Sequence, residues 1–191
     1  MAVAYLNPDG SASAIGWDAS YSTTAAHLAQ GEASNTWRTN FLATGKVIFT
    51  LSDFNNTGVS SITKIENIIV CGLDARSGTA PVISAIRNSG GTTLYSETFN
   101  NPSSGFTTFT GTARTTSNGT AAWTDGDLDG LTLFLTCNGG PHVHAIQQYY
   151  IKVTYEETAA GYGNTVIGIP SAKIDKITGL STANISEVIG I

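Results

Sequence analysis

Two segments of this sequence place an apolar residue at every second position, with Gln147 as the one exception. The first runs from Leu131 to Cys137 and the second from Val143 to Tyr155. Successive side chains of a β-strand point to opposite faces, so a period of two predicts strands with one buried face. In the second segment the predicted inward residues are Ala145, Tyr149, Ile151, Val153 and Tyr155. Its other face is predicted to meet solvent or a partner, and it carries His142, His144, Gln148, Lys152 and Thr154.

Five more segments carry strand signals, namely Lys46 to Leu51, Ile62 to Cys71, Pro81 to Ile86, Thr92 to Phe99 and Phe106 to Thr112. Turn-forming sequences rich in Asn, Ser and Gly separate them. Charged residues make up only 12% of the chain, about half the usual share of roughly 25%. One helical turn is predicted, where Thr124 and Asp127 have the spacing of a capping box. The chain is therefore predicted to be all-β, as a sandwich or a barrel.

The charge balance and the cysteines limit the partners that we expect. Fourteen acidic and nine basic residues give a formal net charge of −5, which repels phosphate and argues against nucleic acid. The apolar runs are too short to span a bilayer, and the first residues lack the pattern of a signal peptide. We therefore expect synthesis in a cytoplasm. Cys71 and Cys137 both end apolar runs and are predicted to be two buried thiols without a disulfide.

The composition changes after Glu157, so we predict a main domain at 1–157 and an assembly tail at 158–191. Three similar tetrapeptides recur in the tail, with glycines at 168, 179 and 190. The repeats are predicted to form short extended pieces that alternate with single helical turns. A short apolar tail cannot bury its own side chains, so it is predicted to bind a neighbouring surface. The predicted interface residues are Val166, Ile167, Ile169, Ile174, Ile177, Leu180, Ile185, Val188, Ile189 and Ile191.

Two stretches of the main domain resemble structural proteins of tailed-bacteriophage particles. The run Ala121-Ala122-Trp123-Thr124-Asp125-Gly126-Asp127-Leu128, followed by a strand that ends Tyr150-Ile151-Lys152-Val153-Thr154-Tyr155, is similar to the closing motif of their jelly-roll-like domains. The tail sequence Ala183-Asn184-Ile185 and its surroundings resemble linker repeats of virion proteins. The resemblance implies a jelly-roll-like antiparallel β-sandwich with an extended C-terminal appendage. It implies no catalytic residues.

Two groups of residues suggest metal binding, and each has a simpler explanation. Asp125, Asp127 and Asp129 match the first half of a calcium loop, but Thr136 stands where the bidentate Glu should be. The preferred interpretation is an acidic turn that caps a helix. His142 and His144 share a strand face, but no third ligand is evident, so surface histidines are the simpler interpretation. We predict no metal and no cofactor.

Exposed aromatic residues raise the alternative of sugar binding. Trp123, Tyr95 and Tyr150 could form a stacking platform, whereas the competing interpretation is that Trp123 closes the end of the sandwich. No nucleophile elbow, phosphate loop or recommended carboxylate pair is present, so we predict that the chain is not an enzyme, although a polysaccharide depolymerase stays open as a third class.

These observations favour a non-enzymatic structural protein of a phage particle, made in the host cytoplasm and located in the virion. The main prediction is a capsid decoration protein that binds other copies of itself, as a homotrimer, and phage capsid or tail proteins. The alternative is a tail- or fibre-associated protein that binds carbohydrate or a host surface.

Overall fold

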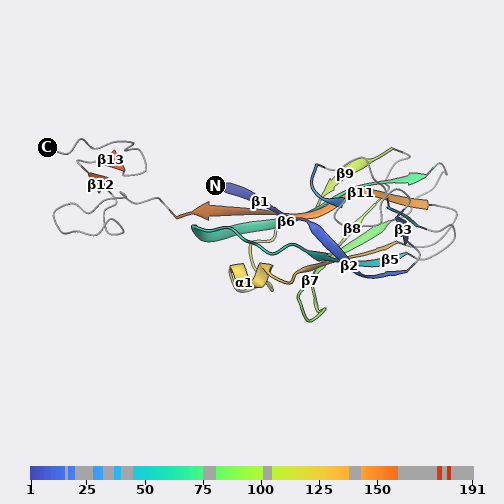
Figure 1. The fold of residues 1–191 in the computed structure, drawn as a ribbon, viewed down its shortest axis with the longest axis horizontal. Coiled ribbons are helices and arrows are strands. Elements are labelled where there is room, and N and C mark those ends of the chain that lie inside the picture. The colour runs from blue at the N-terminus through green and yellow to red at the C-terminus, as the bar shows by residue number, and fades with distance from the viewer. Residues whose placement is uncertain are drawn as a thin grey trace. The chain divides into compact units, whose positions relative to one another are not determined.

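The computed structural model describes two compact units of the chain, Met1–Glu156 and Glu157–Ile191. The described residues are 1–15, 17–19, 28–31, 37–39, 45–74, 81–100, 105–137, 143–158, 176–177 and 180–181. The larger unit consists of two antiparallel sheets, so the predicted all-β sandwich is confirmed (Figure 1). In this described part, no helix has the length and apolar character needed to cross a membrane.

The first sheet follows the order β3 (Trp17–Ala19), β4 (Trp37–Thr39), β11 (Val143–Glu157), β6 (Val59–Asp74) and β9 (Thr107–Thr110). The strand β1 (Ala2–Leu6) pairs with the second half of β11, from Ile151 to Tyr155. The two longest strands, β6 and β11, are neighbours in the middle of this sheet.

The second sheet follows the order β2 (Pro8–Ile15), β5 (Lys46–Leu51), β10 (Thr132–Cys137), β7 (Val82–Arg87) and β8 (Thr93–Phe99). The strands predicted from the period of two are therefore present in both sheets. The last strand in the order of the first sheet is β9, and the last strand in the order of the second sheet is β8. Both are therefore edge strands. The predicted helical turn is α1 (Asp125–Leu128), between β9 and β10.

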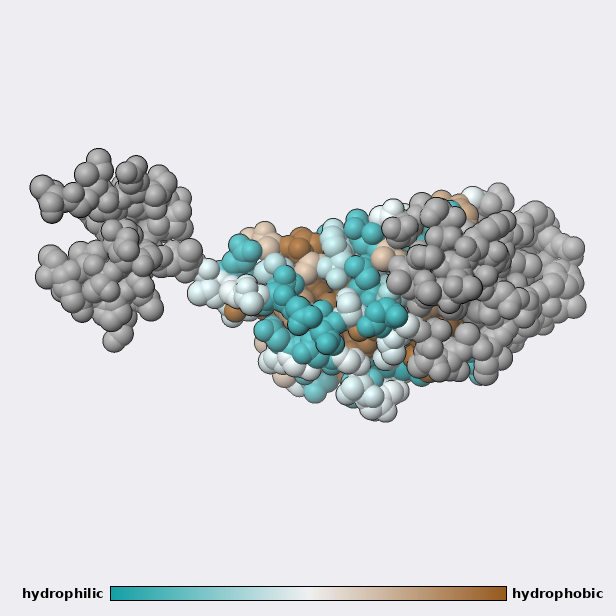
Figure 2. Space-filling model, in the orientation of Figure 1, coloured by the Kyte–Doolittle hydropathy of each residue, from teal (hydrophilic) through white to brown (hydrophobic). Residues whose placement is uncertain are grey.

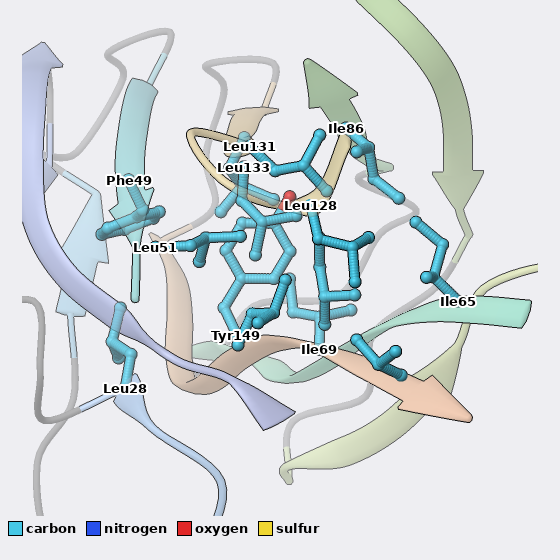
Figure 3. Packing of buried hydrophobic residues seen from close by; sticks show 14 of the residues in the cluster. Leu28, Phe49, Leu51, Ile65, Ile69, Ile86, Leu128, Leu131, Leu133 and Tyr149 are labelled. Atoms are coloured by element: carbon cyan, nitrogen blue, oxygen red, sulfur yellow. The ribbon is translucent and has the colours of Figure 1, made fainter. Parts of the chain in front are cut away.

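The core forms where the alternating residues of the two sheets meet. Leu133 and Leu135 are fully buried, as are Tyr149, Ile151 and Val153 of β11. Figure 3 shows the ring of Tyr149 in the middle of the apolar cluster. Aromatic and branched side chains fill the core of a sandwich about as densely as molecules pack in organic crystals. The inward faces of the two sheets therefore provide most of the stabilisation.

A chain of polar groups crosses this core. The Asn67 amide of β6 donates a hydrogen bond to the Ser84 hydroxyl of β7 at 2.8 Å. Ser84 also bonds to the hydroxyl of Tyr149, which donates to the Phe134 carbonyl at 3.1 Å. Buried polar groups are costly unless they are hydrogen-bonded, and these are. This series of hydrogen bonds therefore links strands of both sheets and fixes how the two sheets are aligned with each other.

The prediction for the second face of β11 is wrong at two positions. His144 and Thr154, predicted to face solvent or a partner, are 1% and 7% exposed. Tyr150 also points away from the core, yet it is 9% exposed and packs edge-to-face on Tyr5. Alternation shows which side chains leave the core, but it does not show what packs over them.

A segment that we call the edge strap, residues 111–124, closes the open side between β8 and β9. Arg114 exchanges two backbone hydrogen bonds with Ile65 of β6, both 2.9 Å. Its guanidinium donates to Glu97 of β8 at 2.9 Å and lies 4.6 Å from the ring centroid of Tyr95. Its carbonyl accepts the indole N–H of Trp123. One residue of the strap thus joins the two sheets.

The strap begins at a glycine that packs closely against side chains of both sheets. A Cβ on Gly111 would lie 1.7 Å from the Asn67 side-chain oxygen and 2.2 Å from a Glu97 oxygen. Contacts this short require the strap or these two side chains to shift. Asn67 donates to Ser84, and Glu97 accepts from Thr112 and Arg114, so a shift of either side chain would disturb those hydrogen bonds.

In the smaller unit, the described residues form one hairpin, in which β12 (Lys176–Ile177) pairs with β13 (Leu180–Ser181). Of the ten predicted interface residues, Ile177 and Leu180 are partners in this hairpin. The extended conformation of this repeat agrees with part of the tail prediction. The other eight lie outside the described residues, as does His142.

Gly111→Ala should destabilise the main domain by more than about 2 kcal/mol, because the added methyl group overpacks the space beside Asn67 and Glu97. Chemical denaturation measures this change. Gly105→Ala is the matched control, since a Cβ there meets open space. Equal stability of the two variants would show that the strap does not pack as described.

Cys71 and Cys137 are free and buried, so the predicted thiols are confirmed. Burial raises the pKa of Cys71 from 9.0 to about 12 and that of Cys137 to about 11. The thiolate is the reactive form, so both residues should resist alkylation in the native protein below these values. Mass spectrometry should find two modified thiols only after denaturation. Rapid native labelling near neutral pH would contradict this burial.

Candidate functional site

Two clefts lie along β8 and the edge strap. The α1 cleft has a volume of about 280 Å³, and its lining includes Asn88, Ser89, Leu94, Ser117, Asn118, Trp123, Gly126, Asp127 and Asp129. The edge cleft has a volume of about 360 Å³, and its lining includes Glu97, Thr98, Phe99, Thr110, Gly111, Thr112 and Arg114. Their sizes are near the lower end of the range for small-molecule sites.

The acidic wall of the α1 cleft is held by the helix cap that the sequence predicts. The Thr124 hydroxyl accepts the backbone N–H of Asp127 at 3.2 Å, and the Asp127 carboxylate accepts the backbone N–H of Thr124 at 2.9 Å. The Asp129 carboxylate accepts the backbone N–H of Phe54 at 3.0 Å. These bonds fix both carboxylates, and the interpretation of this turn as a cap is confirmed.

The candidate metal ligands that the structure describes do not gather into a site. Among the residues that the structure describes, no three His, Cys, Asp or Glu side chains are placed to hold a metal ion together. Asp127 and Asp129 have the structural partners given above, and His144 is buried on β11.

The opposite wall of the α1 cleft comes from two turns. Asn88 closes the turn between β7 and β8, because its side-chain oxygen accepts the backbone N–H of Thr92 at 2.9 Å. In the strap, the Asn118 side-chain oxygen accepts the Thr120 hydroxyl at 2.9 Å. Asn side chains commonly stabilise turns in this way. Here the bonds also fix two amides at the rim of the cleft.

Two apolar residues, Leu94 and Trp123, also line the α1 cleft. Trp123 is only 3% exposed, its indole N–H donates to Arg114, and its ring centroid lies 6.3 Å from that of Tyr95. The interpretation of Trp123 as a core residue is therefore correct. The three predicted platform aromatics do not form one exposed surface, because Tyr150 packs on Tyr5 in a separate pair.

The edge cleft is built around an ion pair. One oxygen of Glu97 accepts the Arg114 guanidinium at 2.9 Å and the backbone N–H of Thr112 at 2.7 Å. The two charged side chains are 14% and 27% exposed. Phe99 also lines this cleft and packs on Phe109, with ring centroids 5.4 Å apart. The lining of the edge cleft therefore combines one aromatic side chain with polar and charged ones.

Sequence reasoning did not select Glu97, although a signal was present. Glu97 stands between Tyr95 and Phe99 at alternate positions of β8, opposite the buried Ser84. An acidic residue on the core face of a strand needs a partner. That signal could have identified Glu97, but not Arg114, which reaches it from a segment without regular secondary structure. Figure 2 shows one face of the described residues, on which hydrophilic residues lie around smaller hydrophobic patches.

No protein-family model matches the chain, and no curated protein matches it. Solved structures do resemble it. An arabinose-bound MgGH51 α-L-arabinofuranosidase is 12% identical with a TM-score of 0.46, and the match covers 78% of this chain and 26% of that one. The enzymatically active domain of tailspike protein 4 from bacteriophage CBA120 is 8% identical with a TM-score of 0.44, over 80% and 19%.

The CBM22-1 xylan-binding domain from Paenibacillus barcinonensis Xyn10C is 14% identical with a TM-score of 0.41, and the match covers 80% of this chain and 92% of that domain. The chain thus spans about a quarter or less of the two larger proteins. These likenesses concern the β-sandwich fold alone.

Proposed function

We propose that this chain is a non-enzymatic, carbohydrate-binding module of a phage tail or fibre. The observation that carries the proposal is the α1 cleft, whose lining combines fixed amide and carboxylate groups with the apolar side chains of Leu94 and Trp123. The cleft favours the alternative that the sequence left open, a tail- or fibre-associated protein that binds carbohydrate. No feature of the described residues provides support for capsid decoration.

The chemistry of the cleft suits a sugar ring. Sugars present hydroxyl groups at the ring edge and C–H groups on the ring faces, so they need hydrogen-bonding walls and an apolar floor. Asn88, Asn118 and Asp127 are already held by hydrogen bonds within the protein. Binding therefore orders few side chains, which lowers its entropic cost.

The arrangement of the carboxylates supports binding without catalysis. Glycoside hydrolysis needs one carboxyl group as a proton donor and a second as a base or nucleophile. Asp127 and Asp129 each use an oxygen to accept a backbone N–H group, and these bonds fix the position of both carboxylates. We therefore assign these two residues to shape and recognition.

The phage context of the proposal comes from the sequence resemblance and from the tail. We propose that the tail, residues 158–191, attaches the module to other copies, as a homotrimer, and to neighbouring particle proteins. The apolar residues of its three repeats support this proposal. The capsid decoration function stays a prediction without a test.

Gly126→Gln should block the α1 cleft without harming the fold. A Cβ at Gly126 meets open space, and glutamine favours a helix over glycine by roughly 0.5–1 kcal/mol. We expect the wild type to bind neutral glycans on an array, and we expect this variant to bind them about tenfold more weakly, or roughly 1.4 kcal/mol. Titration calorimetry measures the difference.

Gly105→Gln is the matched control, because it adds the same side chain at an open position that is not among the lining residues of the α1 cleft. It should bind as the wild type does. A wild-type protein that binds no glycan at all would overturn the proposal, and so would a Gly126→Gln variant that keeps full affinity.

Deletion of residues 158–191 should leave a folded domain that no longer assembles, because the described strands of the sandwich end with β11 at Glu157. Circular dichroism and light scattering measure the fold and the mass of both forms. An unchanged oligomeric state after the deletion would show that the tail does not drive assembly.

A further inference from the structure

We infer that the α1 cleft and the edge cleft are two subsites of one open groove, and that the groove takes a neutral oligosaccharide by its internal residues. This inference rests on the proposed function and goes beyond it. It adds a second binding site around Glu97 and Arg114, and it defines the length and the charge class of the ligand.

The two clefts share the elements that line them. Leu94 of β8 lines the α1 cleft, and Glu97 of the same strand lines the edge cleft. The strap likewise contributes Asn118 to the first and Arg114 to the second. A strand rises by roughly 3.3 Å per residue, so three residues of β8 separate the clefts by about 10 Å. A ligand that fills both must be longer than one sugar.

The segment between the clefts is rigid. The Tyr95 hydroxyl donates to the carbonyl of Thr116 and accepts the backbone N–H of Gly119 at 3.2 Å. The Arg114 guanidinium covers the ring of the same tyrosine. These contacts hold the strap against β8 at Tyr95, which lies in sequence between Leu94 and Glu97. The two subsites therefore keep a fixed separation, which favours a ligand with a regular repeat.

Charge determines which glycans fit. The lining of the two clefts contains three carboxylates, Asp127, Asp129 and Glu97, but only one cationic side chain, Arg114, which is already paired with Glu97. The whole chain carries a net charge of −5. Sugars that carry carboxylates or sulfates would be repelled. Hydroxyl groups can both donate to these carboxylates and accept from Arg114 and the neighbouring threonines.

The test compares ladders of cello-, xylo- and malto-oligosaccharides, from disaccharide to hexasaccharide, by titration calorimetry on the full chain. For the ladder that binds, affinity should rise at least about tenfold from disaccharide to hexasaccharide. Gly126→Gln blocks the α1 cleft, and Thr110→Gln blocks the edge cleft. Each should weaken hexasaccharide binding about tenfold, and the double variant about a hundredfold, because sites this far apart act additively.

Thr108→Gln is the matched control for Thr110→Gln, since both threonines are exposed and lie on one face of β9, and Thr108 is not among the edge cleft's lining residues. If Thr110→Gln binds the hexasaccharide as tightly as this control while Gly126→Gln does not, the groove is wrong and the single-cleft function stands. If affinity does not rise with length, the groove is also wrong. Failure of every ladder to bind overturns the groove, and the proposed function falls with it only if the wild type also binds no glycan on the array.

Discussion

The contacts of Arg114 determine how the open side of this sandwich is closed. Two sheets that pack face to face leave a gap where their edge strands diverge, and here those strands are β8 and β9. Arg114 pairs its backbone with β6 of one sheet and its side chain with Glu97 of the other. Its carbonyl also fixes Trp123. The strap, and with it the walls of both clefts, depends on this residue.

This dependence explains why polar groups occupy an interior that could have been apolar. The Asn67, Ser84 and Tyr149 chain runs through the core, and Glu97 stands opposite Ser84 in the next strand. A buried polar group that loses its partner costs about 1–3 kcal/mol, so a shift in register would leave several groups unpaired. The hydrogen bonds of Asn67, Ser84 and Tyr149 therefore define one alignment of the two sheets. The edge cleft opens at Glu97, where these polar residues approach the surface.

Much of the fold was predictable because a period of two is a local property. The alternation from Leu131 to Cys137 identifies β10, and the capping box at Thr124 identifies α1. The site was less predictable. Asn88, Glu97 and Asn118 are separated by up to thirty positions and come together only because β8, the turn before it and the strap meet on one side. No local pattern contains that information.

By itself the sequence determined the all-β class, the two buried thiols and the helix cap, since each follows from the identity and spacing of nearby residues. Only the tertiary structure decided that His144 and Thr154 are buried, that Glu97 meets Arg114, and that two clefts share one strand. These facts depend on which strands become neighbours and on what covers each face, and both are decided by packing between segments distant in the chain.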